Sequence, residues 1–106
     1  MTGIAMFVAA RAQAGRFDEL VAWYRDHHLP EMRAVSGIGS VTQFRSVDDG
    51  PDGAPTLLTV YGFDSDDVDA QLARLAAVRP GMTPTTALAD ATTWVGWATD
   101  SGRGNP

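Results

Sequence analysis

The order of two hydrophobic patterns along this chain constrains its fold more strongly than any other feature. Four short runs of apolar or β-branched residues predict strands, at residues 4–10, 38–47, 56–63 and 91–99. Two segments with apolar residues at helical spacing predict helices, at residues 17–28 and 68–78. The order β-α-β-β-α-β is typical of a ferredoxin-like α+β fold, in which one antiparallel sheet carries both helices on one face.

Turn-forming residues separate these segments. Gly15 lies in the break after the first strand, and Pro30 is predicted to stop or kink the first helix. The acidic run Asp48–Pro55, rich in Gly and Pro, is predicted to be a solvated hairpin loop. Residues 82–90 are ambiguous and are expected to form a loop with a short helical turn.

The second helix has both a start signal and a stop signal. Asp64 or Ser65 is expected to cap its first turn, and Pro80-Gly81 to end it. Its apolar face is predicted to consist of Val68, Leu72, Leu75 and Val78.

The composition excludes several classes of protein. The chain has 106 residues, which predicts one domain over residues 1–100 and a disordered tail at 101–106. It contains no Cys and no Lys, so disulfides, thiolate metal sites and lysine Schiff bases are excluded. A net charge of −5 argues against nucleic acid and anionic membranes as partners. The first apolar run is far shorter than the ~20 residues that span a membrane, so we expect a cytoplasmic protein.

The predicted strands carry apolar residues on both faces. The run Ile4–Ala10 is continuously apolar, and Thr56–Phe63 is mostly so, which is typical of strands that are covered on both sides. Two helices on one face leave the other face open. In a chain of this size the second layer is expected to be another copy, so the sequence predicts a homodimer formed sheet to sheet.

The two histidines are adjacent and diverge by about 100° on a helix. His28 lies near the centre of the apolar stripe and is expected to face the sheet, where it can act as a general base or hydrogen-bond donor. His27 lies on the flank beside Trp23, and both are candidate ligand contacts. The alternative for His28 is a structural role, as a buried histidine that bonds a carbonyl at the end of a helix.

The predicted strands supply four more candidates. Tyr61 is a candidate donor to a substrate carbonyl or enolate, and Arg45 a candidate partner for a carboxylate. Trp94 and Trp97 are three positions apart on one strand, so one is expected under the helices and the other in the dimer interface. For all four, ordinary packing or solvation is the alternative. No metal site is expected, because adjacent histidines on a helix diverge too far to bind one ion.

The stretch from Phe17 to Pro30, followed by Val35-Ser-Gly-Ile38, resembles the helix and turn of the dimeric α/β barrel superfamily. It is most similar to the EthD-like group, in which an amphipathic helix ends in a His-x-Pro element. The strand Leu57–Asp64 and the helix after it also resemble this group. The resemblance implies that His28 occupies the place of the family histidine and that Tyr24 lines the same pocket.

The resemblance further implies a cleft between sheet and helices for a small, mostly apolar or aromatic molecule. We expect a cofactor-independent enzyme in which His28, with Tyr24 or Tyr61, transfers a proton during cyclisation or isomerisation of a carbonyl-rich aromatic or polyketide-like compound. The alternatives are a non-catalytic binding or accessory protein and a cofactor-free monooxygenase of the same fold. The only Asn is Asn105, in the tail, which gives no support to an Asn-dependent monooxygenase mechanism. Residues 68–78 hold no axial ligand for haem, and no cofactor is expected.

Overall fold

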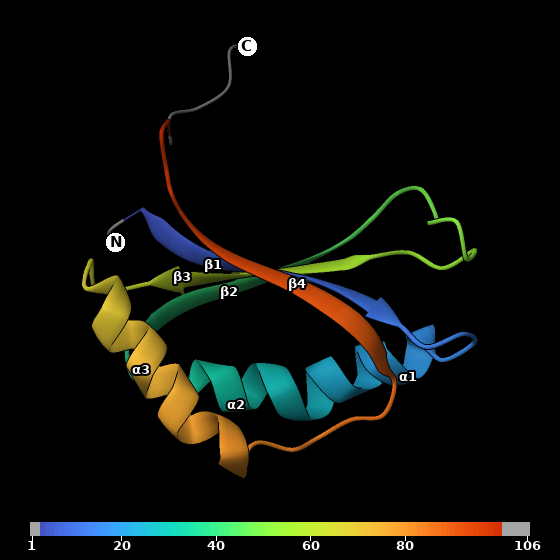
Figure 1. Cartoon of the computed structure of the whole chain (residues 1–106), viewed down its shortest axis with the longest axis horizontal. Coiled ribbons are helices and arrows are strands. Elements are labelled where there is room, and N and C mark those ends of the chain that lie inside the picture. Colours follow the sequence, from blue (N-terminus) through green and yellow to red (C-terminus); the bar gives the residue numbers. More distant parts are fainter. Residues whose placement is uncertain (1–2, 101–106) are drawn as a thin grey trace.

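A four-stranded antiparallel sheet is the frame of the molecule, which a computed structural model describes for residues 3–100. Its strands are β1 (Ile4–Ala12), β2 (Ile38–Arg45), β3 (Leu57–Phe63) and β4 (Leu88–Trp97). They lie in the order β2-β3-β1-β4, so the apolar first strand is inside the sheet, as its sequence predicts. All helices cover one face of the sheet (Figure 1). The predicted ferredoxin-like β-α-β-β-α-β fold is confirmed.

The first helical segment runs without a break from residue 17 to residue 33. It consists of α1 (Phe17–Trp23), a π-helical turn (Tyr24–His28) and α2 (Leu29–Arg33). Pro30 does not stop this helix; it is the second residue of α2 and directly follows the π turn. The departure from regular α-helix instead precedes the proline, in the π turn, where the N–H of Leu29 donates to the carbonyl of Tyr24.

The second long helix, α3 (Val68–Val78), has the predicted bounds, but its capping residue and its buried face differ from the prediction. Its N-cap is Asp67, whose side chain accepts a hydrogen bond from the N–H of Ala70 at 3.0 Å. The predicted face was partly wrong: Leu75 is buried, but Leu72 and Val78 are exposed. Gln71 takes an inward position because its amide donates to the Ser36 carbonyl at 2.9 Å, a partner that helical spacing cannot reveal. A short 3₁₀ turn (Arg79–Gly81) ends the segment at the predicted Pro80-Gly81.

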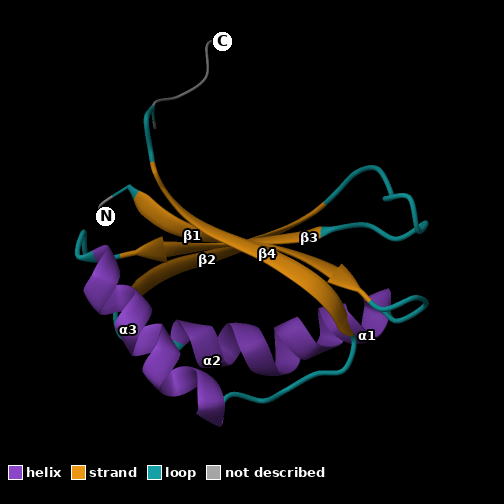
Figure 2. Cartoon of the chain, in the orientation of Figure 1, coloured by secondary structure: helices purple, strands orange, loops and turns teal. Residues whose placement is uncertain are grey.

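Strand ends differ from the sequence prediction by a few residues. β2 ends at Arg45 instead of Val47, and β4 spans 88–97 instead of 91–99. β4 starts earlier because β1 continues to Ala12 and pairs with it as far as Leu88. The connection 46–56 is a loop, as predicted (Figure 2).

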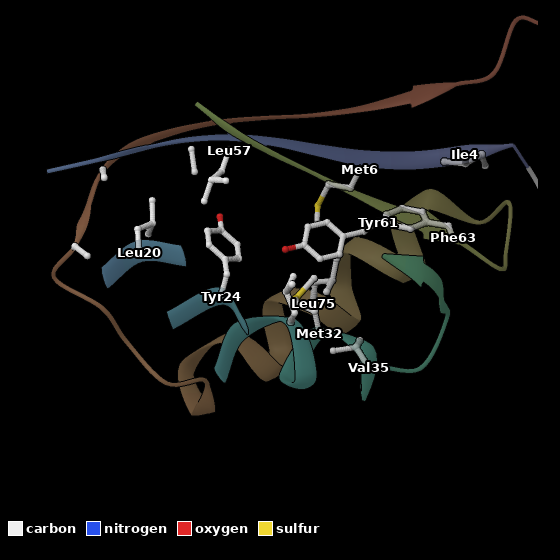
Figure 3. Packing of buried hydrophobic residues seen from close by; sticks show 14 residues of the cluster. Ile4, Met6, Leu20, Tyr24, Met32, Val35, Leu57, Tyr61, Phe63 and Leu75 are labelled. Atoms are coloured by element: carbon white, nitrogen blue, oxygen red, sulfur yellow. The ribbon is translucent and has the colours of Figure 1, made fainter. Parts of the chain in front are cut away.

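The hydrophobic core lies between the sheet and the helices. Figure 3 shows Met6 and Tyr61 reaching down from the sheet, with Met32 and Leu75 rising from the helices to meet them. These side chains are all buried. Burial of this kind is the main source of stability in a domain of this size.

The opposite face of the sheet has no helix over it (Figure 2). The strand register places Phe7, Leu58, Val60, Phe44 and Trp94 on this face. The side chains of Phe44 and Trp94 are 54% and 47% exposed. The described residues therefore include an open apolar surface, and the homodimer that would cover it stays a prediction.

Two other sequence predictions concern membrane spans and the C-terminal tail. Within residues 3–100, no helix is both long enough and apolar enough to cross a membrane. The tail at 101–106, predicted to be disordered, lies outside the described residues.

Candidate functional site

A cavity of about 580 Å³ lies between the helices and the sheet. Its wall is mostly apolar, and residues from both layers contribute to it, among them Met6, Met32, Leu75, Met82 and Leu88. Trp23, His28, Tyr61 and Arg79 also line it. Cavities of this size and composition are typical of sites for small organic molecules.

Within residues 3–100, two buried polar atoms of residues that line this cavity have no hydrogen-bond partner. They are Nδ1 of His28 and the hydroxyl oxygen of Tyr61. A buried polar group without a partner costs about 1–3 kcal/mol of stability, so such groups are few in folded proteins. Both residues line the same cavity, so a ligand bound there would lie beside both side chains.

The π turn and its aromatic neighbours fix the position of His28. Its imidazole stacks on the indole of Trp23, with ring centroids 4.6 Å apart and an interplanar angle of 17°. The ring of Tyr24 meets it edge-on at 5.4 Å. Two aromatic contacts at a large angle to each other leave the imidazole little rotational freedom. Its unpaired nitrogen is therefore held in one place, as a catalytic base requires.

The electrostatic surroundings keep His28 neutral near pH 7. Burial lowers the pKa of His28, the charge of Glu31 opposes that shift, and the charge of Arg79 adds to it. Burial also raises the pKa of Tyr61, the neighbouring Tyr24 raises it further, and the Thr59 side chain opposes the shift. His28 is thus a neutral imidazole with one acceptor nitrogen, and Tyr61 is a protonated donor.

Tyr24 lies beside the cavity rather than in its lining. It is buried, and Figure 3 shows it rising from the helix towards the sheet, with the hydroxyl of Tyr61 pointing towards it. Burial raises the pKa of Tyr24, while a side-chain hydrogen bond with Thr59 opposes that shift. Its contacts make it a support for His28 and Tyr61.

Trp23 and His27 were both predicted to contact a ligand, and they have different surroundings. Trp23 lines the cavity, as expected. His27 is exposed and lines a separate outer groove of about 440 Å³, together with Glu19, Asp26 and the loop 83–86. Trp23 also lines this groove, so its indole separates the groove from the cavity.

The other predicted contacts lie away from the cavity. Arg45 sits over the ring of Phe17, 5.1 Å from its centroid. Trp94 stacks on Phe7 on the open face of the sheet, with ring centroids 5.3 Å apart. Trp97 lies opposite Ile4 at the end of the sheet and is 64% exposed, so it does not pack under the helices as was expected for one of the two tryptophans.

Sequence reasoning missed one wall of the cavity, which comes from the connection between α3 and β4. Thr83 anchors this loop: its N–H donates to both carboxylate oxygens of Glu31 at 3.1 Å, and its hydroxyl donates to one of them at 3.0 Å. The indole N–H of Trp23 donates to the Thr83 carbonyl at 3.0 Å. The Pro80-Gly81 signal predicted a break here, but nothing in the sequence indicated where the chain would go next.

Comparisons with known proteins support the fold. No family model matches this chain, and no curated protein does. A MhuD mutant, solved with two manganese protoporphyrin IX per active site, has a TM-score of 0.68 at 17% identity and covers 95% of this chain and 99% of its own. A monooxygenase from the gene ActVA-Orf6 of Streptomyces coelicolor, solved with nanaomycin D, has a TM-score of 0.64 at 14% identity and covers 98% and 94%.

A third structure is called an antibiotic biosynthesis monooxygenase, with a TM-score of 0.57 at 14% identity, covering 92% of this chain and 99% of its own. None of the three is described as EthD-like, so that part of the resemblance is not confirmed. At these identities the likeness shows the fold alone. The chain therefore has a ferredoxin-like fold that is similar to the folds of these proteins.

Proposed function

We propose that this protein binds a small hydroxylated or carbonyl-bearing aromatic molecule in the cavity and that His28 removes a proton from it. The observation that carries the proposal is the pair of buried, unpartnered polar atoms, on His28 and Tyr61, at one apolar cavity. A structural histidine at the end of a helix would have a protein partner for its buried nitrogen, and this one has none among the described residues.

The two groups have complementary roles in this chemistry. The neutral imidazole of His28 accepts a proton from a phenol or from a carbon next to a carbonyl. The hydroxyl of Tyr61 donates a hydrogen bond to the phenolate or enolate oxygen that forms, which stabilises the new negative charge. The apolar wall excludes water and strengthens both interactions.

Oxygenation is the reaction that we favour after this proton transfer, because two of the structural neighbours are named monooxygenases. A phenolate is electron-rich and can react with dioxygen without a cofactor. One oxygen atom becomes a new ring carbonyl, the other leaves as water, and the substrate supplies the electrons, so a phenol yields a quinone. This chain has no Asn within residues 3–100, so His28 and Tyr61 would carry the chemistry without an amide side chain.

Cyclisation or isomerisation would follow from the same proton transfer without oxygen. Binding without turnover is the third possibility, since the cavity alone suits a binding or accessory protein. Oxygen uptake and product analysis with a panel of phenolic and polyketide-like compounds separate the three. Uptake that needs His28 supports oxygenation, a product without uptake supports rearrangement, and ligand binding without product supports the accessory role.

Porphyrin is a further ligand class to consider, because the MhuD structure contains it. A bound porphyrin metal ordinarily needs an axial His, Cys, Met or Tyr. Helix α3 has none of these residues, although His28, Tyr61 and three methionines line the cavity. The ligand titrations therefore include a porphyrin beside the phenolic compounds.

A further inference from the structure

Arg79 brings a positive charge to the wall of the cavity. It is the first residue of the 3₁₀ turn after α3, and it lines the same cavity as His28 and Tyr61. Its positive charge acts on the imidazole of His28 and lowers the pKa of that residue. No Asp or Glu is among the residues that line this cavity.

Several other arginines pair with an acidic side chain. Arg11 pairs with Asp52, and Arg25 pairs with Asp26 at 2.9 Å. Within residues 3–100, Arg79 makes no ion pair and no side-chain hydrogen bond. Glu31, whose charge also acts on His28, already accepts three hydrogen bonds from Thr83. Arg79 is an exposed residue of the cavity lining, and no carboxylate among the lining residues neutralises its charge.

We propose that Arg79 binds a carboxylate on the ligand, so that the aromatic molecule is held between Arg79 at one end and His28 with Tyr61 at the other. This inference rests on the proposed function of the cavity. A guanidinium binds a carboxylate through two parallel hydrogen bonds, which selects strongly for the ionised acid over a neutral ester. The substrate class is thus an aromatic carboxylate that also carries a hydroxyl or carbonyl group.

The bound carboxylate also changes the pKa of His28, the proposed base. Because the charge of Arg79 lowers the pKa of His28, an anion paired with Arg79 cancels part of that effect and makes the imidazole more basic. Glu31 acts on His28 in the opposite direction, while Tyr24 and Tyr61 lie close by in their uncharged forms. A ligand acid is therefore expected to raise the pKa of His28, and the matching ester is not.

Calorimetric titration of a hydroxynaphthoate, its methyl ester and its primary amide tests the proposal. The wild type is expected to bind the acid about tenfold more tightly than the ester or amide, as charge-assisted hydrogen bonds allow. Arg79→Gln should lower the affinity for the acid to that for the ester and leave the ester unchanged. Arg25→Gln, which removes an equal charge from an exposed residue outside the cavity lining, is the matched control and should change neither.

Each result separates this proposal from the function on which it rests. Equal affinity for acid and ester, both lost in His28→Ala, would retain the proposed function and overturn the role of Arg79. A preference for the acid that needs Arg79 but is indifferent to His28→Ala and Tyr61→Phe would retain the anion site and overturn the proton transfer. No binding of any of the three probes would overturn both. Thermal melts of each variant confirm that the protein is folded.

Discussion

Neighbouring side chains of this protein have very different environments, and His27 and His28 show it best. His27 is exposed in the outer groove, while His28 is half-buried between two aromatic rings, with one nitrogen unpaired. The difference comes from their angular separation on the helix, which places one imidazole at the surface and the other over the cavity.

The two alanine replacements should therefore differ. We expect His28→Ala to lower turnover at least 100-fold, since general bases contribute about 10²–10⁴-fold, and to lower the free energy of unfolding by at most about 1–2 kcal/mol. His27→Ala should change neither by a measurable amount. Steady-state kinetics or ligand titration, together with urea unfolding, checks both variants. A large loss of stability in His28→Ala with unchanged ligand affinity would point to the structural role instead.

The stability of the fold should depend on the protonation of His28. Burial lowers its pKa in the folded state below the unfolded value of about 6.5, so between these two pKa values the unfolded chain binds a proton that the folded chain does not. The free energy of unfolding should then fall as the pH falls below about 6.5. Urea unfolding at a series of pH values measures this slope. It should be smaller in His28→Gln, and an equal slope in that variant would assign the effect to other groups.

How far the sequence predicts the site depends on where each residue lies. The inward orientation of His28 was predicted from the amphipathic pattern of its helix, although the π turn that carries it was not. Tyr61 followed from its place on an apolar strand. Arg79 and Thr83 could not be identified, since they lie around a turn whose path depends on contacts with Glu31 and Trp23, far away in the sequence.

At the scale of elements, one close contact locks the turn after α2 against α3. Gly37 has a φ of +90°, and a Cβ at this position would lie 1.8 Å from the side-chain oxygen of Gln71. That side chain is fully buried and also accepts a hydrogen bond from Arg74 at 2.7 Å. The glycine therefore allows β2 to start directly beside α3.

Gly37→Ala should lower the free energy of unfolding by about 3 kcal/mol, because it adds backbone strain and also displaces Gln71 from its hydrogen bonds. Gly53 offers a matched control, with a φ of +76° but no atom within 4 Å of a new Cβ. Gly53→Ala should cost only the backbone strain, about 1 kcal/mol. Urea unfolding compares the two, and equal losses would show that the contact with Gln71 adds nothing.

The helices and strands could be predicted where the local pattern of apolar residues determines them. The order of strands and helices followed from alternating and helical periodicities. The face of α3 did not, since a buried glutamine looks polar in the sequence and its partner lies at Ser36. The prediction that Pro30 stops or kinks its helix failed for a related reason, because the sequence does not reveal the π turn that directly precedes this proline.

For the whole molecule, the open face of the sheet favours association of two copies. This face carries Phe7, Phe44 and Trp94, and the helix layer lies on the other side. Apolar surfaces of this kind usually mark an interface. We expect sedimentation at micromolar concentration to give a species of twice the chain's mass.

A single charge on that face should dissociate the dimer. Phe44→Asp places a carboxylate among apolar side chains, and its desolvation in the interface is expected to weaken association by at least tenfold. Leu72→Asp adds the same charge on the exposed side of α3 and serves as control. Dissociation by both variants alike, or a wild type that is monomeric, would contradict this arrangement.

The π turn makes this helix equivalent to a regular one into which a single residue has been inserted. Tyr24 and Leu29 are both buried although they are five positions apart, where a regular helix would bury residues three or four apart. An alignment that keeps one helical phase from Phe17 to Arg33 is therefore one position out of step after Tyr24. A homologue without the insertion could keep in register either the residues before Tyr24 or those from Leu29 onwards, but not both. The single extra residue is thus what allows both halves of this helix to face the core.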